Sequence, residues 1–452
     1  MKIIVAGDGK FGATLTRQLT AEGHDLTVID VDSHVLDRSV ERYDVMAVQG
    51  NCASLKVLRQ AGAEDANLLI AATDADEVNL LCCMTAHGMN RDLHTIARIR
   101  SPEYLEQTYL MRDIFALSLT VNPEKRAATE IERLLRYPGF LKRDTFAKGR
   151  VEIVELRVEE NSAICNQPLN RLNDILKCRI LVCAVVRSGN SVAPDGSFVL
   201  RAGDRIFVTA PTDTIATLLK NLGIVTRPVN RVMVCGGGRI SFYLAEKLQK
   251  SGIRVQIIEP DRERCVELAS RLPQADIICG DARDESLLDS EGLDTCDAIV
   301  TVTGLDELNM VLSLYAGDHG VPQIVTKVGR SETVSVLGSL PLGSIVCPKD
   351  LACSAIVRYV RAMQQQAGAA VAVHSIADGQ AQALEFHIDD SVQNCGKPLK
   401  ELKIRSNTLI CCITHGAQTV IPNGDSCFQK GDIVVVVTNG DFAPLQFYDI
   451  FA

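Results

Sequence analysis

Five short apolar runs alternate with helix-length segments in the first third of the chain. The runs are IIVAG from Ile3, LTVID from Leu26, DVMAVQ from Asp44, NLLIAAT from Asn67 and HTIARI from His94. Short apolar runs separated by helix-length segments are typical of parallel strands joined by crossover helices. The pattern therefore predicts an α/β domain built on a doubly wound parallel sheet.

The same pattern returns in the second half of the chain. The segment IIVAGDGKFGATLTRQLTAEGHDLTVIDVD from Ile3 matches VMVCGGGRISFYLAEKLQKSGIRVQIIEPD from Val232. After a one-residue insertion, matching positions continue as far as Asn79 and Asn309. A register kept over this distance indicates an internal duplication.

A second, weaker repeat follows each of these segments. VEIVELRVEENSAICNQPLNRL from Val151 parallels AQALEFHIDDSVQNCGKPLKEL from Ala381. Both stretches are short and rich in strand patterns, so each predicts a small α+β domain. The expected order is N1 (residues 1–147), C1 (148–228), N2 (229–370) and C2 (371–452). In this arrangement two Rossmann-like domains are each followed by a small α+β domain.

Composition narrows the class of protein further. Hydrophobic residues make up 46% of the chain and charged residues 23%, which is a globular composition. The net charge of -9 argues against a nucleic-acid binder, which needs clustered Lys and Arg. No run approaches the roughly 18 apolar residues that span a bilayer. The 16 cysteines include no CxxC spacing and mostly lie in apolar runs, so reduced structural thiols and no metal site are expected.

The motif with the clearest chemistry is GDGKFG, between the first predicted strand and helix. Gly7 permits a tight turn, Gly9 lets the backbone approach a pyrophosphate, and Gly12 lets helix and strand pack closely. Asp30 closes the next strand, where a carboxylate can bind a ribose hydroxyl and repel a 2′-phosphate. The predicted ligand is NAD(H), with ATP or ADP as further candidates. The residues expected to bind it here are Gly7, Gly9, Lys10, Phe11, Gly12 and Asp30.

The corresponding loop of N2 departs from this motif at one position. It reads CGGGRIS, so Ser241 stands where the third glycine is expected. Glu259 supplies the acidic residue at the end of the next strand. Both a second nucleotide site and a structural remnant remain open. If it binds, the contacts are expected from Gly236, Gly238, Arg239, Ile240 and Glu259.

Later loops supply further candidates. The carboxyl ends of parallel strands meet at one edge of a sheet, so residues that follow the fourth and fifth strands are expected beside the same ligand. Basic groups there suit phosphates of a nucleotide bound to the same or to a neighbouring subunit, and the alternative is that they are solvated loop charges. These candidates are Ala72, Thr73, Asn79, Arg98 and Arg100 in N1, and Thr303, Lys327 and Arg330 in N2.

C1 and C2 offer little for catalysis. Neither sequence contains a Ser/Tyr/Lys grouping or an evident His–Asp pairing, and no partner is apparent for His374 or His387. Two nucleotide sites joined to small β-rich domains favour a non-enzymatic regulator whose domain arrangement responds to ligand. An NAD-dependent oxidoreductase with diverged substrate domains is the alternative.

Each N domain ends in a further predicted helix. Asn122-Pro123 and Pro348 are good helix starts, and an apolar stripe follows each. Such a helix lies beyond the core strands. It can pack within its own domain or on another N unit, and both arrangements remain open.

The order N1–C1–N2–C2 resembles the TrkA family, the peripheral regulatory subunits of bacterial Trk-type potassium uptake systems with tandem regulator-of-potassium-conductance domains. The resemblance covers nearly the whole chain. Its most specific stretches are VLRQAGAEDANLLIAATDADEVN (57–79), IARIRSPEYL (96–105), GDGKFG and GDA (280–282). Two departures are Asn51-Cys52 in place of the usual pair after Gly50, and Ser241 in N2.

The resemblance implies a cytoplasmic protein that binds NAD(H) and adenine nucleotides. It further implies a homo-oligomer, a tetrameric ring formed through the N units, which docks on the inner face of the cell membrane without inserting. The implied partner is a potassium-translocating membrane subunit of Trk type. A related module that controls another cation channel or an efflux system is a further alternative.

Overall fold

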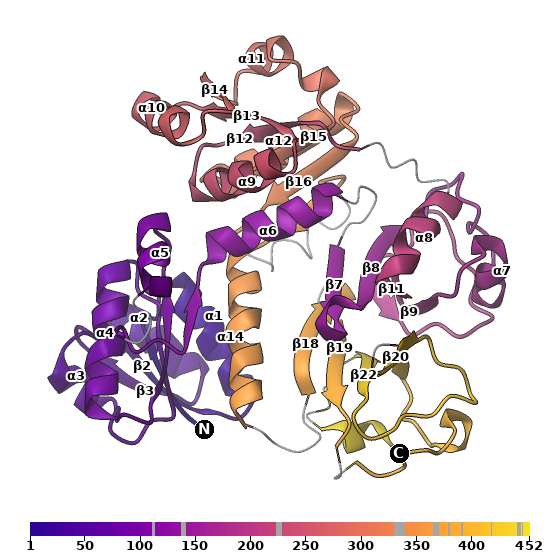
Figure 1. Ribbon diagram of the computed structural model, residues 1–452, viewed down its shortest axis with the longest axis horizontal. Coiled ribbons are helices and arrows are strands. Elements are labelled where there is room, and N and C mark those ends of the chain that lie inside the picture. The colour runs from indigo at the N-terminus through magenta and orange to yellow at the C-terminus, as the bar shows by residue number, and fades with distance from the viewer. Residues whose placement is uncertain are drawn as a thin grey trace. The chain divides into compact units, whose positions relative to one another are not determined.

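The computed structural model describes residues 1–110, 114–136, 142–222, 228–329, 340–364, 370–377, 380–389, 392–416, 418–440, 444 and 446–452. The chain divides into two compact units. The first contains Met1–Ala127 with Cys347–Val360, and the second contains Ala128–Val346 with Arg361–Ala452 (Figure 1). No helix in the described part of the chain is long and apolar enough to cross a membrane.

The first unit contains a six-stranded parallel sheet in the order β3-β2-β1-β4-β5-β6. Ile3 of β1 pairs with Leu26 of β2 on one side and with Leu68 of β4 on the other. The strand order therefore reverses at β1, and ligands of doubly wound sheets bind beyond the carboxyl ends of the strands at such a point. The strands are β1 (Lys2–Ala6), β2 (Asp25–Asp30), β3 (Met46–Gln49), β4 (Leu68–Ala71), β5 (His94–Arg98) and β6 (Leu119–Val121); the helices are α1 (Lys10–Ala21), α2 (Ser33–Arg42), α3 (Leu55–Gln60), α4 (Asp76–Met89) and α5 (Pro102–Leu110).

The second unit contains the equivalent sheet of N2, in the order β14-β13-β12-β15-β16-β17. Neighbouring strands of this sheet are all parallel, and the order reverses at β12 as it does at β1. The predicted tandem pair of Rossmann-like sheets is confirmed. The strands are β12 (Arg231–Cys235), β13 (Arg254–Glu259), β14 (Asp276–Cys279), β15 (Ala298–Thr301), β16 (Gln323–Lys327) and β17 (Ser344–Val346); the helices are α9 (Arg239–Lys250), α10 (Arg262–Arg271), α11 (Glu285–Ser290) and α12 (Asp306–Asp318).

Two antiparallel sheets, also in the second unit, form C1 and C2. Their orders are β10-β9-β11-β8-β7 and β18-β19-β22-β20-β21. In C1 the elements are β7 (Lys142–Phe146), β8 (Val151–Arg157), α7 (Leu172–Leu176), β9 (Leu181–Arg187), β10 (Asn190–Val192), β11 (Arg205–Pro211) and α8 (Ile215–Asn221). In C2 they are β18 (Ala370–Ile376), β19 (Ala381–His387), β20 (Thr408–His415), β21 (Gln418–Val420) and β22 (Ile433–Asn439).

C1 and C2 share one hydrophobic core. Phe146, Cys183 and Phe207 of C1 belong to the same buried cluster as Cys411 and Val435 of C2. The backbone N–H of Ala147 donates to Glu385 Oε2 at 2.7 Å inside this contact. The two domains therefore bury one another's apolar sheet faces, a pairing that the strand periodicity alone does not specify.

The histidines of C2 have carboxylate partners, contrary to the sequence-based prediction. His374 Nδ1 lies 2.8 Å from Asp144 Oδ1, and the two residues are 230 positions apart in the chain. His387 Nε2 lies 3.5 Å from Glu385 Oε1. In C2, His415 pairs with Asp432 at 2.9 Å. The prediction of no His–Asp pairing was wrong for two reasons. Packing of C1 on C2 brings His374 to Asp144, and pairing of β20 with β22 brings His415 to Asp432.

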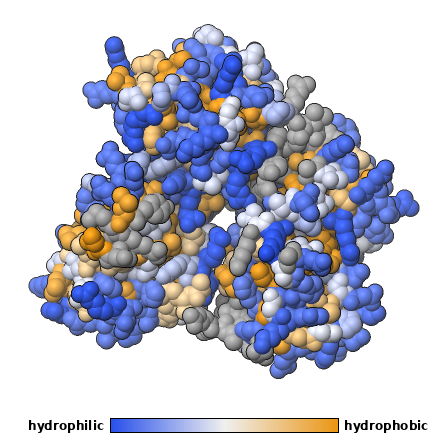
Figure 2. Space-filling view, viewed as in Figure 1, coloured by the Kyte–Doolittle hydropathy of each residue, from blue (hydrophilic) through white to orange (hydrophobic). Residues whose placement is uncertain are grey.

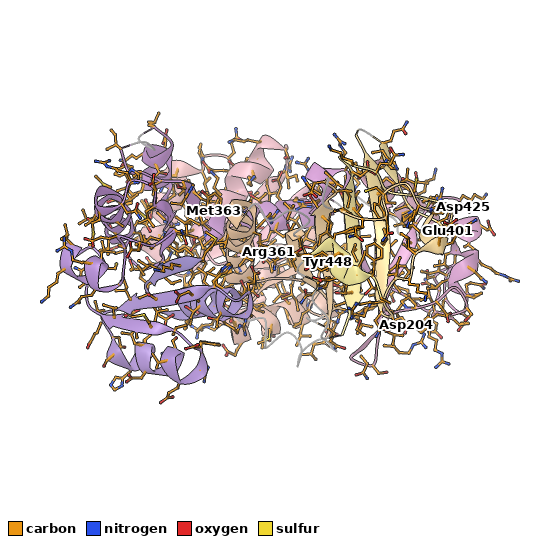
Figure 3. All side chains as sticks on the ribbon, turned by 90° about the horizontal axis from the view of Figure 1, so that it is seen from below. Asp204, Arg361, Met363, Glu401, Asp425 and Tyr448 are labelled. Atoms are coloured by element: carbon orange, nitrogen blue, oxygen red, sulfur yellow. The ribbon has the colours of Figure 1, made fainter. Side chains whose placement is uncertain are left out.

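The His415 pair replaces an Arg pair in C1. There, Arg187 Nη2 lies 2.7 Å from Asp204 Oδ2, and Asp204 is labelled in Figure 3. Asp204 and Asp432 are both buried and both follow a Gly in the repeat. These pairs hold a turn closed in each domain, which is a structural role.

The last helix of each N domain belongs to the unit that holds the other N domain. Helix α14 (Pro348–Gln364) lies in the first unit as far as Val360, and Tyr359 Oη is 3.1 Å from His94 Nδ1 there. Helix α6 (Pro123–Arg136) lies in the second unit from Ala128, where Gln323 Nε2 donates to Leu134 O at 2.6 Å. Packing on the other N unit is thus the arrangement observed (Figure 1). The predicted domain ranges stay predictions, since the compact units cut across them.

Candidate functional site

The glycine loop of N1 joins β1 to α1 at the carboxyl edge of the sheet. Gly7 has φ +93°, and a Cβ there would lie 2.7 Å from Thr73 N. A Cβ on Gly12 would collide with the carbonyl oxygen of Gly7. A Cβ on Gly9, by contrast, would meet no heavy atom within 4 Å. Gly7 and Gly12 are therefore required by the loop itself, whereas Gly9 leaves open space above the loop.

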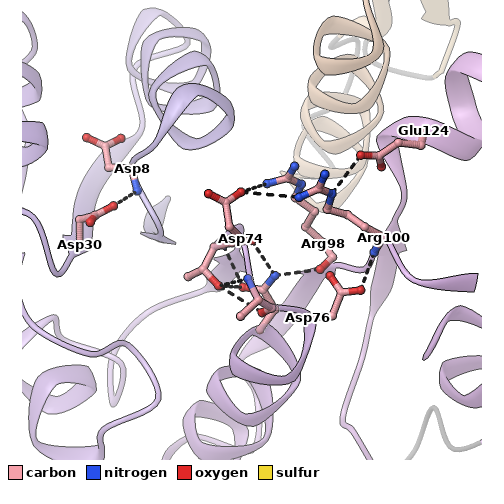
Figure 4. Close-up of polar contacts among 10 residues, drawn as sticks. Asp8, Asp30, Asp74, Asp76, Arg98, Arg100 and Glu124 are labelled. Carbon is pink, nitrogen blue, oxygen red and sulfur yellow. Dashed lines mark hydrogen bonds and ion pairs between the residues drawn. The ribbon is translucent and has the colours of Figure 1, made fainter. Parts of the chain in front are cut away.

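Asp30 holds this loop through its carboxylate. Its Oδ2 accepts from Asp8 N at 2.7 Å and its Oδ1 from Asp32 N at 3.0 Å, as Figure 4 shows for the first contact. In N2, Glu259 does the same for Gly237 N at 2.6 Å and Asp261 N at 2.9 Å. Both acids are partly exposed, so each can also meet a hydroxyl from outside.

The residues after β4 and β15 form matching networks. Thr73 donates from N and Oγ1 to Asn79 Oδ1 at 2.9 and 2.7 Å, and Asn79 Nδ2 donates to Arg98 O at 2.9 Å. In N2, Thr303 and Asn309 repeat these bonds, and Asn309 Nδ2 donates to Lys327 O at 3.1 Å. Asn79 is fully buried. It links the loop after β4 to the end of β5 and so positions the residues that line the edge.

The basic residues of N1 lie at this edge, held by carboxylates. Arg98 Nη1 is 3.3 Å from Asp74 Oδ1, and Arg100 Nε is 2.9 Å from Glu124 Oε1 (Figure 4). The Arg98 guanidinium also lies over the ring of Phe11, 5.1 Å from its centroid. Burial, and then the neighbouring Arg100 charge, lower the pKa of Arg98 from its ordinary value. A partly desolvated cation beside the glycine loop is suited to a phosphate.

In N2 the corresponding cation is Lys327. Its Nζ lies 3.1 Å from Asp306 Oδ1 and 3.3 Å from Thr303 O. Arg330, the other predicted basic residue, lies outside the described residues. Lys327 therefore sits beside the loop after β15, as Arg98 sits beside the loop after β4.

The remaining predicted residues cluster at the two helix starts. Lys10 and Arg239 are exposed first residues of α1 and α9, while Phe11 and Ile240 are buried directly after them. Gly238, like Gly9, leaves open space where a Cβ would stand. Ala72 is buried behind Gly7, and Gly236 has φ +106°. The structure thus brings the predicted set of each half to one edge of its own sheet.

Ser241 is compatible with the N2 loop. Its side chain is fully buried, and its Oγ donates to the carbonyl oxygen of Gly236. That carbonyl is the counterpart of the one that a Cβ on Gly12 would strike in N1. In N2 the conflict is replaced by a hydrogen bond.

Two residues beneath and beside the loops were not identified from the sequence. Asp8 is buried, with Thr16 Oγ1 donating at 3.2 Å and Ser39 Oγ at 2.5 Å, and burial raises its pKa. In N2, Arg264 Nε donates to Gly237 O at 2.7 Å. Aligning the two halves would have marked both positions, because Asp8 is opposite Gly237, and Val35 is opposite Arg264.

The described residues include no group of three or more His, Cys, Asp or Glu placed to hold a metal ion. The arrangement in each half is instead an anion-binding edge. It combines an open glycine loop, the N-terminus of a helix, a partly exposed acid at the end of the second strand and a nearby cation.

Comparison with known proteins agrees with this arrangement. The TrkA-N domain model matches residues 3–117 and again 232–348, and the TrkA-C domain model matches residues 153–223. The Trk system potassium uptake protein TrkA of Vibrio alginolyticus is 30% identical over 442 residues, covering 96% of this chain and 95% of that protein.

Solved structures agree at the level of the fold. The GsuK RCK domain has a TM-score of 0.62 at 17% identity and covers 97% of this chain and 92% of that chain. The GsuK channel bound to NAD has a TM-score of 0.60 at 18% identity and covers 97% of this chain and 76% of that chain. Together, the two TrkA-N matches and the full-length relative show that the chain belongs to the TrkA family.

Proposed function

We propose that this chain is a nucleotide-sensing regulatory subunit of a potassium uptake system. N1 binds NAD(H) or an adenosine phosphate, and the bound state controls a potassium-translocating membrane protein. The observation that carries the proposal is the N1 loop, where Gly9 leaves open space beside Asp30 and Arg98. The Vibrio relative, which matches nearly the whole length of the chain, is named a Trk system potassium uptake protein.

The predicted ligand contacts divide into three roles. The N–H groups at the start of α1, with Gly9, receive the pyrophosphate. The Asp30 carboxylate receives a ribose hydroxyl and repels a 2′-phosphate, which favours NAD(H) over its phosphorylated form. Arg98, partly desolvated over Phe11, meets a phosphate once its weak contact with exposed Asp74 is exchanged.

N2 is proposed as a second, unequal site. Gly238 leaves the same open space as Gly9, and Glu259 holds its loop as Asp30 does. The Ser241 hydrogen bond favours a working loop over a structural remnant, because it preserves the turn. Lys327, and Arg264 beside the glycine loop, give N2 a different set of cations from N1, so its ligand preference is expected to differ.

The role is proposed to be regulatory rather than enzymatic. His374 and His387, the histidines considered for acid–base work, are engaged with Asp144 and Glu385 in the C domains. A regulator needs a ligand that binds two domain arrangements with different affinities, and it needs no reacting group. The discriminating observation is NADH turnover, which an NAD-dependent oxidoreductase would sustain with a suitable substrate.

Assembly into a ring of four chains, on the cytoplasmic face of the membrane, completes the proposal. Leu81 on α4 and Val311 on α12 occupy equivalent positions and are 52% and 61% exposed. Figure 2 shows a face that is mainly hydrophilic with separate hydrophobic patches. Exposed apolar side chains at equivalent positions of the two halves suit contacts between copies of the chain.

The test uses purified protein with NADH and with ADP. Thermal stabilisation by either nucleotide, with no loss of nicotinamide absorbance over time, is expected. In vesicles that contain a Trk-type membrane subunit, the same nucleotides should change potassium flux only when this chain is added. Sustained NADH oxidation with any candidate substrate would contradict the regulatory role, and unchanged flux would contradict the partner.

A further inference from the structure

Two cysteines lie beside the acidic residue of the N2 site. Cys279 is the last residue of β14 and pairs in register with Glu259, the last residue of β13. Cys265, in α10, donates its thiol to the carbonyl oxygen of Glu259 at 3.2 Å. The same oxygen accepts from Gly280 N, the residue after Cys279, at 3.0 Å. The Cys265 thiol and the backbone N–H that follows Cys279 therefore meet at one backbone carbonyl, which places the two cysteines side by side at the carboxyl edge of the sheet.

The two thiols differ in access to solvent. Cys279 is exposed, whereas Cys265 is buried. The pKa of Cys265 is raised to about 11, first by burial and next by its hydrogen bond with the Cys279 thiol. An exposed thiol can meet an oxidant directly, and a contacting buried thiol can then resolve the product.

The pair belongs to N2 alone. In N1 the equivalent positions hold Leu36 and Gln49. The pair also differs from Cys183 and Cys411, which are buried in the core shared by C1 and C2 and so lie away from solvent. The chain thus contains an internal control, an equivalent sheet edge without thiols.

We propose that Cys265 and Cys279 form a redox modification site that a hydroperoxide converts from dithiol to disulfide. The Cys279 thiol releases its proton, and the thiolate attacks one oxygen of hydrogen peroxide; the O–O bond breaks, sulfenic acid forms, and the departing hydroxide takes up that proton as water. The Cys265 sulfur then attacks the Cys279 sulfur, the S–O bond breaks, and the departing hydroxide leaves as a second water with the proton of the Cys265 thiol. The two thiols together lose two electrons, and one hydrogen peroxide is reduced to two waters.

Oxidation also alters the nucleotide edge, a consequence that rests on the proposed nucleotide site of N2. A disulfide brings the sulfurs to about 2.05 Å, so Cys265 leaves its hydrogen bond with Glu259 O. Arg264, the preceding residue, donates to Gly237 O in the glycine loop and moves with it. Affinity of N2 for ADP is therefore expected to fall on the order of tenfold, the effect of losing about one hydrogen bond.

The first measurement is chemical and independent of any nucleotide. Full-length protein is treated with hydrogen peroxide, remaining thiols are alkylated, and peptides are mapped by mass spectrometry. A linked Cys265–Cys279 peptide that dithiothreitol removes is expected. Cys279→Ser should abolish it, while Cys395→Ser, at an exposed cysteine in C2, should not. Absence of the linked peptide in treated wild-type protein, with both residues alkylated, would overturn the proposal.

The second measurement follows ADP binding in the Gly9→Val chain, in which N1 is blocked. Reduced protein should bind ADP about tenfold more tightly than oxidised protein, and Cys279→Ser should show no dependence on peroxide. A linked peptide with unchanged affinity would overturn the coupling to the nucleotide. No ADP binding by reduced protein would instead overturn nucleotide binding at N2, while the peptide map still decides the disulfide.

Discussion

N1 fills the space beneath its glycine loop with polar side chains, whereas N2 fills it with small and apolar ones. Asp8 of N1 accepts hydrogen bonds from Thr16 and Ser39. The equivalent positions of N2 hold Gly237, Ala245 and Leu268. A Cβ on Gly237 would lie 2.8 Å from Leu268 Cδ1, so the larger leucine has taken the place of the aspartate. The three positions therefore differ as a set.

The same loop geometry can therefore be supported by two different sets of buried side chains. Both loops keep the same backbone hydrogen bonds to an acid from the second strand. Beneath them, N1 has a buried carboxyl group and N2 has a packed aliphatic contact. The halves are thus expected to share ligand geometry while differing in stability and in response to pH.

Blocking the open space above each loop should give the largest effect. Gly9 and Gly238 have φ −62° and −69°, values open to any residue, and a Cβ at either meets nothing within 4 Å. Gly9→Val should therefore fold but remove nucleotide binding at N1, and Gly238→Val should do the same at N2. Stabilisation from the blocked site, about 2.7 kcal/mol at a ligand concentration of 100 Kd, should disappear.

Isothermal titration with ADP and with NADH measures this effect in each variant. The two variants serve as controls for one another, because each keeps the other site. Unchanged binding in Gly9→Val would mean that the pyrophosphate does not lie over this loop.

The third glycine should show the next effect. In Gly12→Ser, the new Cβ collides with the Gly7 carbonyl, so α1 must move away from β1. A cost of about 2 kcal/mol is expected, as for overpacking in a core. Hydrogen exchange of the α1 amides should accelerate while that of α9, which carries Ser241 naturally, stays the same. Equal exchange in wild type and variant would show that N1 accommodates serine as easily as N2.

The sequence predicted well those features that local chemistry imposes. Apolar runs bounded by turns located the strands, and the glycine spacing located both loops, because tight backbone turns tolerate few other residues. Asp30 and Glu259 were found because each closes the strand that follows its glycine loop. The acids bind their own loops as well, a contact that a motif alone does not reveal.

Features that depend on distant pairing were missed. Periodicity shows that a face is buried but not what covers it, so the exchange of α6 and α14 stayed undecided between two arrangements. His374 and Asp144 are 230 residues apart, and nothing local to either marks the contact. In the sequence, Arg264 has the pattern of an ordinary charged residue on a surface helix, and only the structure reveals its hydrogen bond to Gly237 O. The C1–C2 core was hidden likewise, since each sheet alone accounts for its own pattern.

Removing the Ser241 hydroxyl should have a smaller effect than crowding Gly12. Ser241→Ala keeps the Cβ but deletes the hydrogen bond to the Gly236 carbonyl. A loss of about 1 kcal/mol is expected, within N2 only. Hydrogen exchange of the α9 amides measures it, and Thr85→Ala, which removes an exposed hydroxyl bond on α4, is the control. No change in α9 would indicate that the turn is held by its backbone alone.

The smallest effect should be the pH response of Asp8. Burial raises its pKa above the ordinary value of 3.8, although Ser39 and Thr16 oppose the shift. Folding thus favours the protonated form, and this contribution is fully present below the unfolded pKa and is lost as pH rises through the folded one. Asp8→Asn removes the titration, so its stability relative to wild type should rise from acid pH towards neutrality. Thermal unfolding of both proteins across that range measures the difference, with ligand absent. Gly237 gives N2 no such group, and a pH-independent difference between the two proteins would mean that Asp8 stays ionised throughout.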